Sequence, residues 1–199
     1  MNMFNNRLFS SLNTIVDLFL LNLLWVLSMF PLITFFPATA ALFGVVRKRI
    51  LHKETDGIFK SFFQLFKENF KQSFGISVLW TVVGLFLYFD YQLIDPSSSA
   101  VQLIVYIVLI LAILLFSSVS MYLFPIIVHF ELGWKYVIRN AFLFSLMNPV
   151  LTILLLLILG ACIAIIQLYP AAIFLIGSPS AYIIYHLCQR WFNQVVEMR

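Results

Sequence analysis

The chain has 199 residues, of which 63% are hydrophobic and only 10% are charged. A water-soluble domain carries about 25% charged residues, and the mean hydropathy of +1.03 is far higher than such a domain shows. The composition therefore excludes a globule that folds in water and predicts a protein whose solvent is lipid. The net charge of +4 does not indicate a nucleic-acid partner, because the basic residues lie between apolar runs, where the positive-inside rule accounts for them.

The first hydrophobic stretch covers residues 11–46 and is interrupted by two prolines, Pro31 and Pro37. A single helix of that length would measure about 54 Å, well beyond a hydrocarbon core of about 30 Å. Pro37 suits the first turn of a new helix, and Thr34 lies just upstream. The sequence thus predicts a first span near 13–30 and a shorter helix that starts at Pro37. A signal-peptide cleavage site just after this proline is disfavoured, because the apolar run before it is too long.

Four further apolar runs follow, and we interpret them as membrane helices: 74–89, 100–128, 150–169 and 171–188. Together with the first two elements they predict an all-α fold, a polytopic integral membrane helix bundle of six hydrophobic helices, the second one short. The whole chain, 1–199, is expected to form a single membrane-embedded domain.

The charge distribution predicts the orientation of these helices. If both termini lie in the cytoplasm, all twelve Lys and Arg residues fall on the cytoplasmic side, as the positive-inside rule requires. The outer loops then keep Asp90 and Asp95 and no basic residue. Five spans with the N-terminus outside are an alternative, since only Arg7 would then lie on the outer side.

The segment DGIFKSFFQLFKENFKQSF, residues 56–74, predicts an amphipathic helix that Asp56 is placed to cap. At about 100° per residue its phenylalanines share one face, which ends at Phe74, and its lysines flank that face. Two interpretations remain open: an interfacial helix on the cytoplasmic leaflet, or a docking surface for a cytoplasmic partner. The candidate lipid- or partner-docking residues are Phe59, Phe62, Phe63, Phe66, Phe70, Lys60, Lys67 and Lys71.

A second segment of the same kind is GWKYVIRNAF, residues 133–142. Its apolar residues recur at helical spacing, and Lys135 and Arg139 lie one turn apart. We therefore expect one or two interfacial amphipathic helices beside the six hydrophobic ones.

Residues with catalytic potential are sparse. No motif for phosphate binding, metal ligation or nucleophilic catalysis occurs in the sequence, and Cys162 and Cys188 are expected to be packing residues. Acid–base chemistry has only four candidates, which are far apart in the sequence: Asp17, His129, Glu131 and His186. We therefore predict no enzymatic activity, no metal site and no cofactor.

Polar and small residues within the apolar runs suggest how the helices meet. Asp17 is expected at the membrane interface, and side chains such as Asn22 and Thr39 are expected to form interhelical hydrogen bonds. Gly160 and Ala164 form a small-xxx-small pair that suits close helix packing or a homo-oligomer. The prolines that break the first hydrophobic stretch are also typical of helices that line a cavity in transporters.

Several motifs together resemble the YesL-like family, bacterial integral membrane proteins with no established function. They are NLLW (22–25), PLITFFPATAAL (31–42), GIFKSFFQLFKENF (57–70) and RNAF (139–142). Phe36 departs from the pattern, since a glycine is expected before Pro-Ala-Thr, and this puts a tight turn there in doubt. The residues that carry the family motif are Asn22, Trp25, Pro31, Thr34, Pro37, Thr39 and Asn69.

The resemblance implies a multi-pass protein of the bacterial plasma membrane. It also implies a link to carbohydrate uptake and breakdown, because the family is often encoded beside sugar ABC-transporter components in Gram-positive bacteria. The function we expect is therefore an accessory or regulatory partner of a carbohydrate uptake system, in contact with the lipid bilayer and with an ABC transporter permease or another membrane component. The alternative is a stand-alone transporter of a sugar or another small solute.

Overall fold

The computed structural model describes residues 3–51, 57–130 and 132–197. Over this part of the chain the regular structure is entirely helical, as the composition predicts. Seven α-helices and two short 3₁₀ helices follow one another: α1 (Met3–Ser28), η1 (Leu32–Thr34), α2 (Phe35–Ile50), α3 (Ile58–Leu93), α4 (Ala100–Phe130), α5 (Trp134–Met147), α6 (Pro149–Leu168), η2 (Pro170–Ala172) and α7 (Ile173–Glu197).

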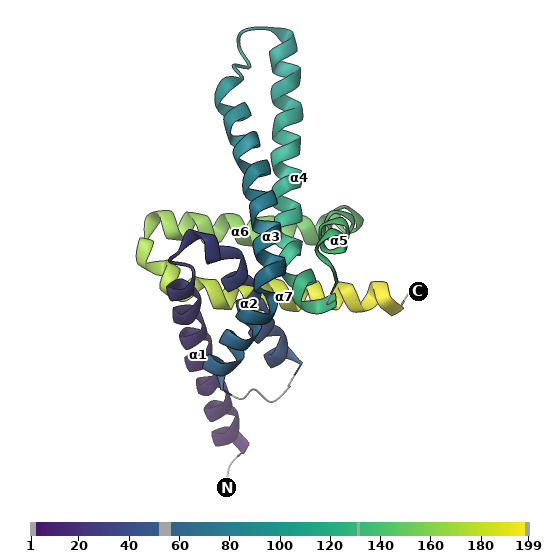
Figure 1. The fold of residues 1–199 in the computed structure, drawn as a ribbon. Coiled ribbons are helices and arrows are strands. Elements are labelled where there is room, and N and C mark those ends of the chain that lie inside the picture. The colour runs from purple at the N-terminus through teal and green to yellow at the C-terminus, as the bar shows by residue number, and fades with distance from the viewer. Residues whose placement is uncertain (1–2, 52–56, 131, 198–199) are drawn as a thin grey trace.

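Two helix pairs dominate the shape of the molecule (Figure 1). Helices α3 and α4 stand upright as a tall antiparallel hairpin, and α6 and α7 run across the base of that hairpin. Helix α1 descends from the same region and packs on α7. The long helices therefore cross one another and do not all run parallel.

Helix α2 lies at the centre, and every residue from Pro37 to Val46 is buried. It packs against α1, α3, α4 and α7. Small residues make this possible, since a Cβ on Gly44 would lie 3.0 Å from a Leu65 methyl of α3. The predicted short second helix is thus confirmed, although it begins at Phe35, two residues before Pro37. Its 16 residues measure about 24 Å.

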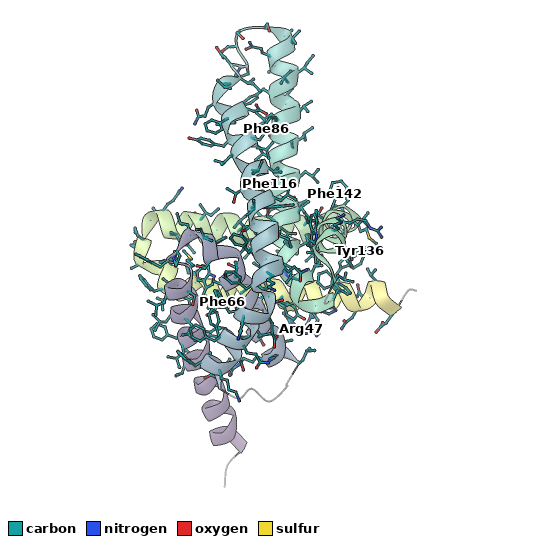
Figure 2. The ribbon with its side chains drawn as sticks, viewed as in Figure 1. Arg47, Phe66, Phe86, Phe116, Tyr136 and Phe142 are labelled. Atoms are coloured by element: carbon teal, nitrogen blue, oxygen red, sulfur yellow. The ribbon has the colours of Figure 1, made fainter. Side chains whose placement is uncertain are left out.

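Four helical stretches are long and apolar enough to cross a membrane: Ile58–Leu93, Ala100–Phe130, Pro149–Leu168 and Pro170–Val195. Thr14–Ser28 is a shorter apolar helix. Large hydrophobic side chains project from these stretches, among them Phe86, which is 65% exposed (Figure 2). Such surfaces are typical of a protein that faces lipid. The structure therefore supports the prediction of a helical protein embedded in a membrane. Four of the six predicted hydrophobic helices are candidate spans.

The prediction of a separate interfacial helix over 56–74 is wrong. Helix α3 runs unbroken from Ile58 to Leu93, because no proline interrupts it and the buried residues Ser73 and Ile76 pack on either side of the expected junction. Its start is set by Gly57, whose φ of 87° favours glycine. The predicted cap, Asp56, lies outside the described residues.

The second amphipathic segment does form a helix of its own, α5, between Gly133 and Asn148. Asn148 then starts α6, because its side-chain oxygen accepts a hydrogen bond from the Leu151 backbone N–H at 3.0 Å. This is the usual role of an asparagine N-cap, and it fixes a sharp change of direction between α5 and α6.

Helices α1 and α7 pack closely at Gly177. A Cβ built on this glycine would lie 2.5 Å from the Trp25 ring and 2.6 Å from the Asn22 side-chain oxygen, both on α1. Cβ contacts shorter than 3.0 Å are essentially never found in proteins, so the Trp25 ring, the Asn22 side chain or one of the two helices would have to shift. Glycine at 177 is therefore required by the packing of α1 on α7.

We expect the Gly177→Ala variant to lose about 1–3 kcal/mol of stability, the usual cost of overpacking a well-packed site. Gly75→Ala is the matched control, because a Cβ on Gly75 meets nothing within 4 Å. Thermal unfolding of both purified variants in one detergent checks this. Equal melting temperatures would contradict the close approach.

Candidate functional site

The phenylalanines of the N-terminal half of α3 form a continuous row of rings, here called the phenylalanine ladder: Phe59, Phe62, Phe63, Phe66, Phe70 and Phe74. Ring centroids are 4.8 Å apart at the first pair and 6.0 Å apart at the last. These separations fall in the range of favourable aromatic pairs. The face that the sequence predicts is therefore present.

The ladder has one edge inside the protein and one edge outside. Phe62 is completely buried, and Phe66 packs against the core. Phe59 is 66% exposed and Phe63 is 43% exposed. The sequence left open whether these rings face lipid or another protein. The structure shows that Phe62 faces neither, because it is buried within this chain.

The three lysines predicted to flank the ladder, Lys60, Lys67 and Lys71, are exposed. They form a ridge of positive charge along α3, beside the exposed edge of the ladder. The exposed rings and the lysine ridge together make an amphipathic surface on this half of the helix. Such a surface suits either anionic headgroups or an acidic and apolar protein partner.

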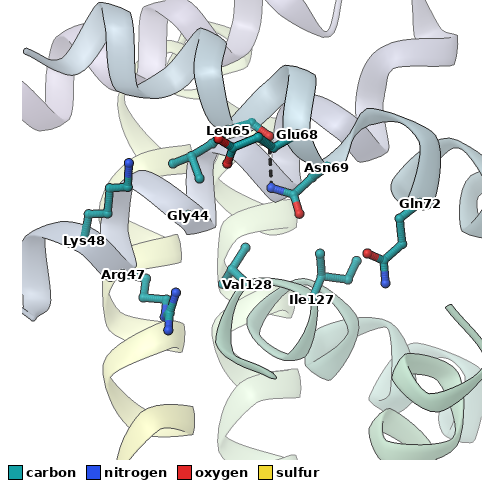
Figure 3. A pocket seen from close by; sticks show the side chains of 9 residues that line it. All are labelled: Gly44, Arg47, Lys48, Leu65, Glu68, Asn69, Gln72, Ile127 and Val128. Carbon is teal, nitrogen blue, oxygen red and sulfur yellow. Dashed lines mark hydrogen bonds between the residues drawn. The ribbon is translucent and has the colours of Figure 1, made fainter. Parts of the chain in front are cut away.

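A polar pocket of about 270 Å³ lies on another side of α3, between this helix, α2 and α4 (Figure 3). Two cations come from the C-terminal turns of α2, and the acid and two amides come from α3. Hydrocarbon groups complete the walls. The lining residues are Gly44, Arg47, Lys48, Leu65, Glu68, Asn69, Gln72, Ile127 and Val128.

Two amides position the walls of this polar pocket. The Asn69 side-chain nitrogen donates to the Leu65 carbonyl at 2.9 Å, which leaves the amide oxygen directed towards the pocket (Figure 3). Gln72 donates to the Leu132 carbonyl at 2.6 Å and so ties α3 to the segment after α4. With two cations, one carboxylate and amide groups, the pocket has the chemistry to bind a small anionic or polar group.

An ion pair joins the basic end of α2 to α1. The Arg49 Nη1 lies 2.5 Å from Asp17 Oδ2, and Arg49 Nη2 donates to the Thr14 hydroxyl at 3.1 Å. The Arg49 side chain is 27% exposed and that of Asp17 is 33% exposed, and the interfacial position of Asp17 stays a prediction. Basic residues in the last turn of α2 also interact favourably with the helix dipole.

Asn22 connects α1 to α7 with both ends of its amide. Its nitrogen donates to the Ile173 carbonyl at 2.9 Å, and its oxygen accepts from the Ser178 backbone N–H at 2.8 Å. Asn22 is completely buried. The predicted interhelical hydrogen bond is thus confirmed for this residue.

Four further motif residues lie at the break between α1 and α2: Trp25, Thr34, Pro37 and Thr39. Trp25 Nε1 donates to the Thr39 hydroxyl at 3.1 Å, and Thr34 donates to the Ser28 and Pro31 carbonyls, each at 2.6 Å. Pro37 lies in the first turn of α2, as predicted.

The structure shows the conformation at Phe36, the position where the sequence departs from the family motif. Phe36 is helical, and its ring lies 5.2 Å from that of Phe124. There is consequently no tight turn at this position. The aromatic ring instead packs α2 against α4.

Three of the four candidates for acid–base chemistry are described by the structure, and each has separate surroundings. Asp17 pairs with Arg49, His129 Nδ1 lies 3.0 Å from the Tyr185 hydroxyl, and His186 stacks on the Tyr182 ring. Glu131 lies outside the described residues. Among the residues that the structure describes, no three His, Cys, Asp or Glu side chains gather into a potential metal site.

The polar pocket itself was missed by the sequence analysis. A signal for it exists, because Glu68, Asn69 and Gln72 recur at helical spacing on the side of α3 away from the exposed phenylalanines. What the sequence does not contain is the position of α2, which brings Arg47 and Lys48 opposite these side chains.

Comparison with known proteins agrees with the family resemblance. Residues 18–91 match DUF624, a family described as proteins of unknown function, and this region holds all of the motif residues. The region also supplies every pocket residue that comes from α2 and α3. No solved structure matches the chain.

Three uncharacterised proteins of Bacillus subtilis (strain 168) are similar to this chain. YteU is 36% identical over 99 residues, 50% of this chain and 43% of YteU. YesV is 28% identical over 171 residues, covering 84% and 82% of the two chains. YesL is 30% identical over 138 residues, covering 68% and 65%. The chain therefore covers less than two thirds of YteU and of YesL.

We expect the Asn22→Ala variant to lower the melting temperature, because the buried Ser178 N–H would lose its partner at a cost of about 1–3 kcal/mol. Asn193→Ala is the control, since this asparagine on α7 is exposed. Unfolding in detergent measures both. A variant of Asn22 as stable as the Asn193 variant would show that the amide does not hold α1 to α7.

Proposed function

We propose a docking function for this chain, which belongs to the DUF624 family of proteins of unknown function. It is an accessory membrane protein that binds a component of a carbohydrate uptake system on the cytoplasmic side of the membrane. The observation that carries this proposal is the exposed edge of the phenylalanine ladder beside the lysine ridge. The link to carbohydrate uptake rests on the family resemblance. The docking surface rests on the chain's own residues.

The length of α3 supports a docking surface outside the hydrocarbon. Its 36 residues measure about 54 Å, whereas the hydrocarbon core measures about 30 Å. The half that carries Lys60, Lys67 and Lys71 is the half that would extend into the cytoplasm, and the half that ends at Leu93 is apolar. One rigid helix would therefore connect the membrane to a cytoplasmic partner.

The composition of the exposed surface favours a protein partner over headgroups alone. Aromatic side chains act as interface anchors when they enter a pocket of the partner, and Phe59 and Phe63 project as an adjacent pair with centroids 4.8 Å apart. An acidic rim on the partner would complement the lysines. We assign this role to an ABC transporter permease or another membrane component of the uptake system.

We propose no enzymatic reaction at the polar pocket. Its titratable lining consists of Glu68, Arg47 and Lys48, and we assign no reaction to them. A sugar path through the protein has less support, because the groove among α1, α2, α4, α6 and α7, described below, is apolar.

Replacement of the exposed rings should abolish docking. We expect the double variant Phe59→Ser with Phe63→Ser to recover no transporter component after mild-detergent affinity purification from cells grown on polysaccharide. The matched control is Phe86→Ser with Phe89→Ser, two exposed phenylalanines on the other half of α3. Equal recovery by both double variants, or none by the wild-type protein, would contradict the proposal.

The proposed orientation places both termini and the lysine ridge in the cytoplasm. In a background that lacks Cys162 and Cys188, a membrane-impermeant maleimide should label Ser98→Cys in intact cells. Asn5→Cys should react only after permeabilisation. Labelling of position 5 in intact cells would favour the five-span alternative and place the N-terminus outside.

A further inference from the structure

An apolar groove of about 330 Å³ lies among α1, α2, α4, α6 and α7, apart from the polar pocket. Most of its wall consists of aliphatic and aromatic side chains. Residues that matter for the argument are Trp25 on α1, Thr39 on α2, Cys162 and Ile163 on α6, and Ser180 on α7. Its volume is about twice that of an apolar cavity that stays dry and binds benzene, and lies in the range of ligand sites.

The few polar side chains in the wall already have partners within the protein. Trp25 Nε1 donates to the Thr39 hydroxyl at 3.1 Å, and that hydroxyl donates to the Phe35 carbonyl at 2.7 Å. The Ser180 hydroxyl donates to the Gly177 carbonyl at 2.9 Å. A sugar in the groove would find few partners for its hydroxyls, and burial without such partners is costly. The lining consequently favours hydrocarbon.

The groove reaches the apolar surface of the molecule. Ile163, on its wall, is 48% exposed, and Phe35 at another edge is also exposed. Ile165 and Leu157, elsewhere on α6, are exposed hydrophobic residues outside the groove. Because α6 is a candidate membrane span, the opening of the groove is continuous with the surface that would face the acyl chains of a bilayer.

We infer that the groove holds the hydrocarbon chain of a membrane lipid, which enters sideways from the bilayer past α6. The volume is too small for a helix of a second copy, which is about 10–12 Å across. A single acyl chain is slender and needs no hydrogen bond. The inference does not depend on the proposed docking function, because the phenylalanine ladder contributes no residue to the groove.

Quenching of Trp25 fluorescence by brominated lipid tests this inference. The protein is reduced to one tryptophan by replacing the other three with phenylalanine: Trp80, Trp134 and Trp191. It is then placed in phosphatidylcholine vesicles with bromine on the acyl chains. Ser180→Phe fills the groove, and Ile183→Phe, on an exposed position of α7, is the matched control.

We expect Trp25 to be quenched in the parent protein and in the Ile183→Phe variant, and the quenching to fall by at least half when Ser180→Phe fills the groove. Equal quenching in all three proteins would mean that Trp25 meets bulk lipid, and absence of quenching in the parent would mean that no chain enters. Either result overturns the inference.

A second measurement needs no bulky substitution. In a Cys188→Ala background, Cys162 is the remaining thiol, and it lies on the groove wall. In delipidated, detergent-solubilised protein, added oleate should slow the reaction of Cys162 with N-ethylmaleimide several-fold. A labelling rate that oleate leaves unchanged would also overturn the inference.

Discussion

The burial of α2 is the constraint on which the rest of the structure depends. A helix of 16 residues is about 24 Å long and does not reach across a hydrocarbon core of about 30 Å. It is stable at the centre because other helices cover ten successive residues, 37–46, on all sides. That cover requires small side chains at close contacts, such as Gly44, where a Cβ would lie 3.0 Å from a Leu65 methyl of α3.

The same requirement explains the motif residues. Asn22 and Trp25 hold α1 against α7 and α2 through hydrogen bonds, and Gly177 allows the approach. These two motif residues therefore fasten the helices around α2. In apolar surroundings such bonds specify which faces meet, since an amide without a partner would be costly there.

Sequence periodicity predicted which side of α3 carries phenylalanine, but not which rings are covered. Phe62 and Phe63 are adjacent in the chain, yet one is buried and the other exposed, because cover depends on the position of neighbouring helices. The partners of Asn22 show the same limit: the Ile173 carbonyl is 151 residues away, a contact that no local pattern encodes. The sequence wrongly predicted a helix end at Phe74. The composition changes there from amphipathic to apolar, but the helix continues to Leu93.

The apolar groove and the polar pocket lie at different heights along α2. Their order along this helix indicates how the fold would sit in a membrane. The apolar groove meets α2 at Phe35, Thr39, Leu42 and Phe43, whereas the polar pocket meets it at Gly44, Arg47 and Lys48. From Thr39 to Lys48 the helix rises about 14 Å. We would expect this order if α2 began at the depth of the hydrocarbon and ended at the headgroups. The apolar groove would then lie near the hydrocarbon and the charged pocket near the headgroups. The basic end of α2 and the lysine ridge of α3 would then lie on the same side of the bilayer, which the positive-inside rule identifies as the cytoplasmic one.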